Sequence, residues 1–123
     1  MKKLIALGVI IVFTLTFNLK LSEARPKMQT IQYAVNLNWC GHIKRKCKAG
    51  KQALEVVRCE TGSTFNVWAG FPRKEYWGLF QMGASERKIY GHGWNPWVQA
   101  KSAHRYWKIA GWSPWPYCGR LYY

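Results

Sequence analysis

Four cysteines constrain the fold of this 123-residue chain more than any other feature, because all of them lie beyond an apolar N-terminal run. They are Cys40, Cys47, Cys59 and Cys118. In a small secreted chain, an even number of cysteines indicates disulfide bonds, and four cysteines allow three pairings. We favour Cys40 with Cys47, which closes a short loop, and Cys59 with Cys118, which ties the C-terminal end to the middle of the chain.

A zinc site is the alternative use of the same cysteines. Structural zinc usually takes ligands in closely spaced pairs such as Cys-x-x-Cys. Here six residues separate Cys40 from Cys47, and Cys59 and Cys118 each stand alone. We therefore expect neither a metal nor another cofactor.

The N-terminus has the pattern of a signal peptide. Two lysines precede an apolar run over residues 4–19, and Ser22 and Ala24 supply the small side chains that a signal peptidase reads. The alternative is an uncleaved anchor, but the run is shorter than the roughly 20 residues that span a bilayer. We expect residues 1–24 to be removed and the remaining chain to be secreted, either extracellular or periplasmic, with no stable membrane insertion.

The remaining chain is strongly basic. Without Lys2, Lys3, Lys20 and Glu23, residues 25–123 hold 16 basic and 4 acidic residues, a net charge of +12. Such a charge predicts attraction to a polyanion, which could be nucleic acid, anionic lipid or an anionic cell wall. Export argues against nucleic acid, for which the chain also has no motif. The eight tryptophans suit either a small core or stacking on sugar rings.

Periodicity and end signals predict a mainly helical chain. Apolar spacing indicates helices over residues 30–39 and 51–59, with Gly50 separating the second from the preceding turn. A short helix is expected over residues 84–90. Asn95 and Pro96 are typical of a helix start, and Gly111 of its end. Residues 61–76 are rich in turn formers and predict an irregular loop or a small β-hairpin.

Glu60 is the candidate functional residue. The chain has five acidic residues and no Asp, so few groups could perform carboxylate chemistry. Ala53, Val56, Val57 and Glu60 share one face of the predicted helix, which would place the carboxylate at the end of a buried stripe. Burial and the C-terminal helix dipole would both favour the protonated acid. The alternative, equally compatible with the periodicity, is a carboxylate just past the helix that points into solvent.

Three blocks together resemble a known family. They are Cys-Glu-Thr-Gly-Ser at 59–63, Tyr-Trp-Gly-Leu-Phe-Gln at 76–81, and Gly-Trp-Ser-Pro-Trp-Pro-Tyr-Cys-Gly at 111–119. In order and spacing they resemble the catalytic domain of resuscitation-promoting factors, which belongs to the lysozyme-like superfamily with the soluble lytic transglycosylases and goose-type lysozymes. The resemblance covers residues 51–120. It implies a small, mainly α member of the α+β class that cleaves the β-1,4 bond between N-acetylmuramic acid and N-acetylglucosamine in peptidoglycan.

The resemblance also implies roles for individual residues. Glu60 would be the catalytic acid, and Thr61, Tyr76, Trp77 and Gln81 would contact the substrate. The disulfide of that family would correspond to the pairing of Cys59 with Cys118 that we favoured above. The expected partners are peptidoglycan glycan strands and anionic cell-wall polymers, bound by a monomer.

The chain departs from the family pattern at three places. Thr61 stands where Ser is usual, Ser63 replaces a common Gly, and residues 71–75 add bulk between the first two blocks. Residues 25–50, with the first cysteine pair, lie outside the match and are expected to form an N-terminal extension.

Glycoside cleavage usually needs a second carboxylate. The candidates are Glu55, Glu75 and Glu86, of which Glu75 is best placed in sequence, because Glu55 lies on another helix face and Glu86 on an expected surface helix. A lone Glu60 would suit lytic transglycosylation, in which the substrate's own 6-hydroxyl closes a 1,6-anhydro ring. The alternative function is a non-catalytic, cationic protein that binds cell walls or acts on membranes.

Overall fold

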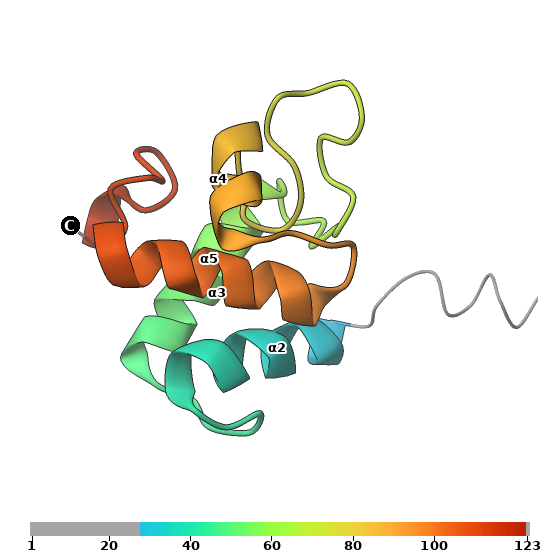
Figure 1. Cartoon of the computed structure of the whole chain (residues 1–123). Coiled ribbons are helices and arrows are strands. Elements are labelled where there is room, and N and C mark those ends of the chain that lie inside the picture. Colours follow the sequence, from blue (N-terminus) through green and yellow to red (C-terminus); the bar gives the residue numbers. More distant parts are fainter. Residues whose placement is uncertain (1–27, 123) are drawn as a thin grey trace, which may run out of the picture.

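The computed structural model describes residues 28–122 and is mainly helical (Figure 1). The prediction of a signal peptide at residues 1–24 lies outside the described residues. The elements are the helices α2, α3, α4 and α5 and a short 3-10 helix, η1; they span Met28–Cys40, Lys48–Glu60, Ala84–Tyr90, Pro96–Ala110 and Arg120–Tyr122 in that order.

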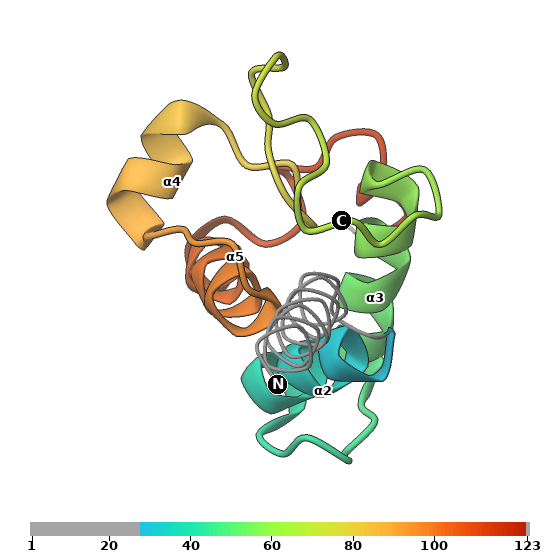
Figure 2. The same ribbon diagram turned by 90° about the vertical axis from the view of Figure 1, so that its right-hand side faces the viewer.

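Three helices form the centre of the domain. α2 packs against both α3 and α5, while α4 packs against α5. The loop that follows α3 protrudes beyond the helices in both views (Figures 1 and 2). α2 belongs to the stretch expected as an N-terminal extension, yet it contributes Ile31, Val35 and Trp39 to the buried core. The apolar face of α2 is therefore covered by α3 and α5, the helices of the region that resembles the known family.

Both favoured disulfide pairings are confirmed. Cys40 is bonded to Cys47, and Cys59 is bonded to Cys118. The first links the end of α2 to the residue before α3. The second links the last turn of α3 to the C-terminal tail across a separation of 59 residues, so it fixes the tail against the helix that carries Glu60.

The predicted start of the second helix was wrong, because α3 begins at Lys48 and contains Gly50 in its first turn. The sulfur of Cys47 accepts a hydrogen bond from the Gly50 N–H at 3.3 Å and caps the helix. A Cβ at Gly50 would collide with the sulfur of Cys40. This glycine therefore gives the disulfide room to approach the helix and does not interrupt it.

The predicted bounds of α4 and α5 are confirmed. At the start of α5, the Asn95 Oδ1 accepts a hydrogen bond from the Val98 N–H at 2.9 Å, and Pro96 is the first helical residue. Gly111 ends the helix with a φ of +60°, which is favourable only for glycine.

The loop between α3 and α4 is irregular. Within the described residues, strand pairing is limited to one antiparallel bridge between Trp77 and Met82. The buried side chain of Gln99 on α5 holds this loop from behind. Its oxygen accepts from the Leu79 N–H at 2.8 Å, and its nitrogen donates to the carbonyls of Val67 and Gly93. The side-chain amide of Gln99, whose oxygen and nitrogen both have hydrogen-bond partners, thus anchors a loop that forms no sheet.

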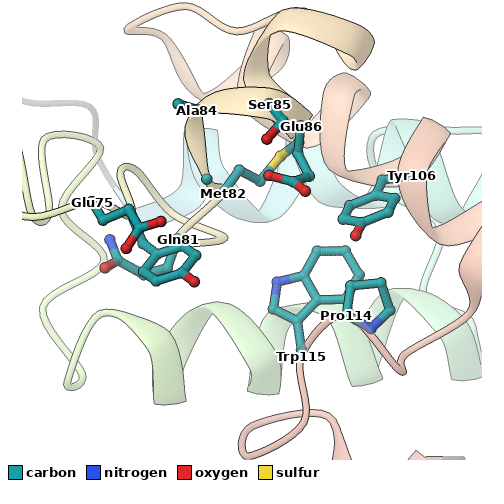
Figure 3. A pocket seen from close by; sticks show the side chains of 11 residues that line it. Glu75, Gln81, Met82, Ala84, Ser85, Glu86, Tyr106, Pro114 and Trp115 are labelled. Atoms are coloured by element: carbon teal, nitrogen blue, oxygen red, sulfur yellow. The ribbon is translucent and has the colours of Figure 1, made fainter.

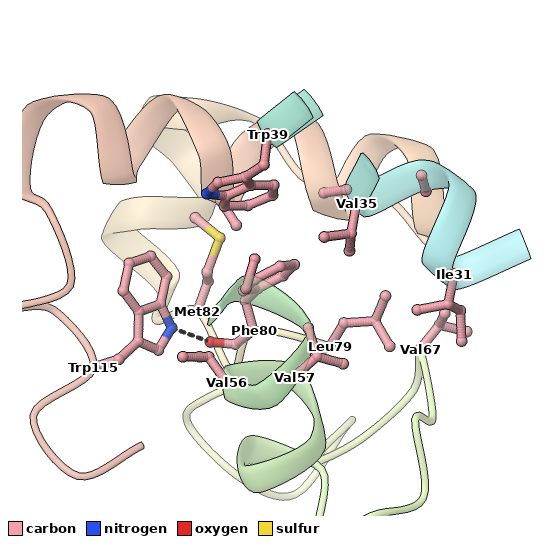
Figure 4. Close-up of a cluster of buried hydrophobic side chains, with 14 of the residues drawn as sticks. Ile31, Val35, Trp39, Val56, Val57, Val67, Leu79, Phe80, Met82 and Trp115 are labelled. Atoms are coloured by element: carbon pink, nitrogen blue, oxygen red, sulfur yellow. Dashed lines mark hydrogen bonds between the residues drawn. The ribbon is translucent and has the colours of Figure 1, made fainter. Parts of the chain in front are cut away.

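An aromatic stack occupies the core (Figure 4). Trp39 on α2 stacks on Phe80 with a centroid separation of 5.3 Å and lies parallel to Trp112. Trp115 donates its indole N–H to the Phe80 carbonyl at 2.8 Å, while Trp112 bonds to Gln52 on α3. The tail is therefore held by its tryptophans as well as by its disulfide.

Candidate active site

Glu60 is the last residue of α3, and the backbone beyond it forms a tight helix end. The Gly62 N–H donates to the Cys59 carbonyl at 3.2 Å, and the Ser63 N–H donates to the Arg58 carbonyl at 2.7 Å. Gly62 has a φ of +58°. This pair of bonds is the Schellman arrangement, in which a left-handed glycine terminates a helix. Together with the neighbouring disulfide it fixes where the Glu60 side chain leaves the backbone.

The carboxyl group of Glu60 is half-buried, and this burial raises its pKa from 4.5 to about 7. Within residues 28–122, no ion pair or hydrogen bond to the protein compensates the lost hydration. Glu55, five residues earlier on α3, has an exposed side chain that lies 3.8 Å from the guanidinium of Arg58. A carboxyl with a pKa near 7 can hold or release a proton at neutral pH.

Thr61, predicted to contact substrate, is only 7% exposed. Its hydroxyl donates to the Val57 carbonyl at 2.8 Å and accepts from the Phe65 N–H at 2.9 Å. Both bonds secure the turn that follows Glu60. Thr61 thus holds the backbone next to Glu60, and its contact with substrate stays a prediction.

A cavity of about 330 Å³ opens between α4, α5, the 75–83 segment and the tail. Three of the predicted residues, Glu75, Tyr76 and Gln81, line it. The opposite side is formed by Tyr106 and Trp115, and the carboxylate of Glu86 points into the space between (Figure 3). The other predicted site residues, Glu60, Thr61 and Trp77, do not line this cavity.

The backbone around Gln81 is specialised for its side chain. Gln81 has a φ of +46°, an uncommon value for a residue with a Cβ. Its carboxamide nitrogen donates to the carbonyls of Ala69 and Gly78 at 2.9 and 3.0 Å. The nitrogen is thus occupied, and the oxygen is the atom that remains to accept a hydrogen bond from a ligand.

Glu86 is a cavity residue that the sequence analysis assigned to a surface helix. It lies in the first turn of α4. A Cβ on Gly83 would stand 2.6 Å from the Glu86 carboxylate and 3.3 Å from the Tyr76 ring, so glycine keeps the space between them open. Burial, followed by the nearby charge of Glu86, raises the pKa of Tyr106. The scarcity of acidic residues made Glu86 one of three candidate second carboxylates in the sequence, although Glu75 was preferred.

Trp77, predicted to contact substrate, faces a different group of rings. Its indole N–H donates to the Lys74 carbonyl at 2.6 Å, and the Arg87 guanidinium covers its ring at 3.8 Å. Its ring neighbours lie in the loops before α4 and α5. We call this group the surface aromatic cluster; its members are Trp68, Phe71, Trp77, His92 and Trp94.

Comparisons with protein-family models, with curated proteins and with solved structures found no match. No helix within residues 28–122 is both long enough and apolar enough to cross a membrane. The same residues contain no group of three His, Cys, Asp or Glu side chains placed to hold a metal ion. The fold and site define a small, mainly helical, disulfide-bonded domain with a half-buried carboxyl at a helix end.

Proposed function

We propose that this protein is a peptidoglycan glycosidase of the lysozyme-like kind, with Glu60 as its general acid. The observation that carries the proposal is the state of Glu60, which is half-buried, lacks a counter-charge among the described residues and has a pKa of about 7. A glycosidic oxygen is a poor leaving group until it is protonated, and an acid with this pKa can supply the proton near neutral pH.

The residues that line the cavity also support the proposal. Tyr76 and Gln81, which the family resemblance assigned to substrate, both line it together with Trp115. Aromatic rings beside a fixed amide oxygen suit a sugar, because its C–H face is apolar and its N-acetyl and hydroxyl groups donate hydrogen bonds. The substrate class is therefore the N-acetylated glycan strand of peptidoglycan.

Two routes are open after the glycosidic oxygen takes the proton from Glu60. In lytic transglycosylation the resulting carboxylate accepts the proton of the muramic 6-hydroxyl while that oxygen closes the 1,6-anhydro ring. In hydrolysis a water molecule replaces the hydroxyl. Glu75 and Glu86 are the candidates for a second carboxylate in the hydrolytic route, because both line the cavity with Tyr76 and Gln81. Glu55 is set apart by its exposure and its pairing with Arg58.

We also propose that the protein acts outside the cytoplasm. Its two disulfide bonds suit an oxidising compartment, and the basic charge of residues 25–123 suits an anionic wall. The same charge and aromatic content would serve a non-catalytic wall-binding protein, which the activity test separates from an enzyme.

The test is digestion of purified peptidoglycan by the parent protein, by Glu60→Gln and by Glu55→Gln, with mass spectrometry of the soluble products. Glu55→Gln is the matched control because it removes an exposed carboxylate from the same helix. We expect Glu60→Gln to lose about 100-fold or more in rate, and the control to match the parent. Products lighter by one water identify transglycosylation. A Glu60→Gln variant that digests as fast as the parent would refute the assignment.

A further inference from the structure

The surface aromatic cluster lies outside the cavity and has no role in the proposed chemistry. Trp68 and Trp94 stack with their centroids 4.3 Å apart and their planes 11° from parallel, and Phe71 meets Trp94 edge-on at 4.7 Å. Yet Trp68 and Phe71 remain 42% and 43% exposed. Rings packed this closely in irregular loops, while retaining so much contact with water, form a preorganised apolar surface.

Positive charge is placed beside these rings by the loop itself. The Lys74 N–H donates to the Gly70 carbonyl at 2.8 Å, and the Lys74 carbonyl accepts the indole N–H of Trp77. The turn that carries Phe71 is therefore closed at Lys74, and it exposes both Arg73 and Lys74. These are among the residues that interrupt the family resemblance.

Hydrogen-bond donors accompany the apolar surface and the charge. Within the described chain, the indole N–H groups of Trp68 and Trp94 donate to no protein acceptor. Those of Trp39 and Trp107 also lack an acceptor, but their nitrogens are buried, whereas Trp68 is 42% exposed. Stacked rings with spare N–H donors and adjacent cations match a sugar that carries carboxylates, whose ring stacks and whose charged groups pair.

A lipid surface fits these observations less well. The exposed residues that follow Phe71 are Pro72, Arg73, Lys74 and Glu75, which place charges of both signs next to the rings. Burying such a segment among acyl chains would require dehydrating a carboxylate as well as two cations.

We propose that the surface aromatic cluster is a second glycan-binding site, which takes an anionic sugar strand outside the cavity lined by Tyr76 and Gln81. The proposal rests on the proposed function for the identity of the strand, which is peptidoglycan whose muramic carboxylates are free because the stem peptides have been removed. The cluster and the cavity adjoin through one segment, because Tyr76 lines the cavity and Trp77 belongs to the cluster. The cluster would hold one stretch of the polymer while the cavity binds another.

The test is binding of peptidoglycan glycan strands freed of their peptides, measured by cosedimentation or fluorescence in the Glu60→Gln background. We expect Trp68→Ala to weaken binding about tenfold, and Trp68→Tyr, which keeps a ring, to retain most of it. Trp97→Ala is the matched control, since Trp97 is 37% exposed but lies outside the cluster, and it should bind normally. Arg73→Gln with Lys74→Gln should reduce the dependence of binding on salt concentration.

The proposal is overturned if Trp68→Ala binds as tightly as its parent, or if Trp97→Ala weakens binding equally. It is also overturned if the protein binds vesicles of phosphatidylglycerol and phosphatidylcholine through Trp68 but does not bind the strands. Thermal unfolding of each variant checks that lost binding is not lost folding. Digestion by the parent is scored separately, so failure of this site and failure of the proposed enzyme give different results.

Discussion

Two groups of aromatic rings in this protein are each built around one tryptophan, but only one group is buried. Trp39 contacts the buried rings of Phe80 and Trp112 and the half-buried rings of His104 and Trp107. Its position on α2, at helical spacing from Ile31 and Val35, places it against α3 and α5.

The rings around Trp94 come from loops and lie at the surface. Trp68 and Phe71 belong to the loop after α3, and Trp94 to the turn before α5. Aromatic content alone does not distinguish the two groups, and neither does the element that carries each ring, because Phe80 lies in the loop after α3 and Trp112 in the tail after α5. The difference is burial, since Phe80 and Trp112 are 1% and 3% exposed, whereas Trp68 and Phe71 are 42% and 43% exposed. Buried rings supply stability, and exposed rings on irregular loops are available for binding.

The largest expected effect is on the buried group. Trp39→Ala should lower the free energy of unfolding by about 5 kcal/mol, because it removes a large side chain that four rings contact. Denaturant titration followed by circular dichroism measures the change. Trp39→Phe is the conservative control and should lose much less, since it keeps a ring and removes a buried indole N–H that lacks a partner among the described residues. A loss below about 1 kcal/mol for Trp39→Ala would contradict the assignment of Trp39 to the core.

The second effect concerns the two disulfides. Replacing Cys59 and Cys118 by Ser should lower stability by about 4 kcal/mol, because their bond closes a long loop. Replacing Cys40 and Cys47 should cost about 2–3 kcal/mol, since that loop is short. Denaturant titration compares the pairs.

Only replacement of the first pair, Cys59 and Cys118, should also reduce digestion of peptidoglycan under conditions where the protein is still folded, because their bond holds the helix end that carries Glu60. Equal loss of activity from both double replacements would show that the Cys59–Cys118 bond has no special role in holding Glu60.

The smallest effect is expected for the stability of the surface group. Trp68→Ala should lower the free energy of unfolding by less than about 1 kcal/mol, as most surface substitutions do. The same denaturant titration used for Trp39 measures it. A loss comparable to that of Trp39→Ala would show that Trp68 stabilises the fold as a core residue does, and that the two groups of rings do not differ in this way.

Much of the helical framework could be predicted from the sequence, because its signals are local. Asn95 and Pro96 start a helix, and Gly111 ends it, through their own backbone preferences. The spacing of Ala53, Val56 and Val57 likewise predicted a buried face, and all three are fully buried.

The remaining features depend on contacts between distant residues. Gly50 resembles a helix breaker until the sulfur of Cys40 is seen beside it. Glu86 faces the cavity only because α4 packs on α5, which no local pattern records. Thr61 and Trp77 were chosen for the blocks in which they stand; their hydrogen bonds lie within the protein, and their contact with substrate stays a prediction.

The central claim is that the surroundings of Glu60 keep its carboxyl protonated near neutral pH. A folded-state pKa of about 7 means that the acid is available below this pH and is lost as the pH rises through it. The sign for stability follows from the same shift. The unfolded carboxyl ionises near 4.5, so the folded state loses stability between pH 4.5 and about 7, and Glu60→Gln should relieve this loss above pH 7.

The most direct measurement is a titration of the protein labelled with carbon-13 at the glutamate side-chain carboxyls, followed by NMR. The chain has five acidic residues, all Glu, so the carboxyl signals are few and Glu60→Gln identifies the one of interest. The account predicts one carboxyl that titrates near pH 7 and is absent from Glu60→Gln. Titration of every carboxyl near its ordinary pKa of about 4.3 would contradict it.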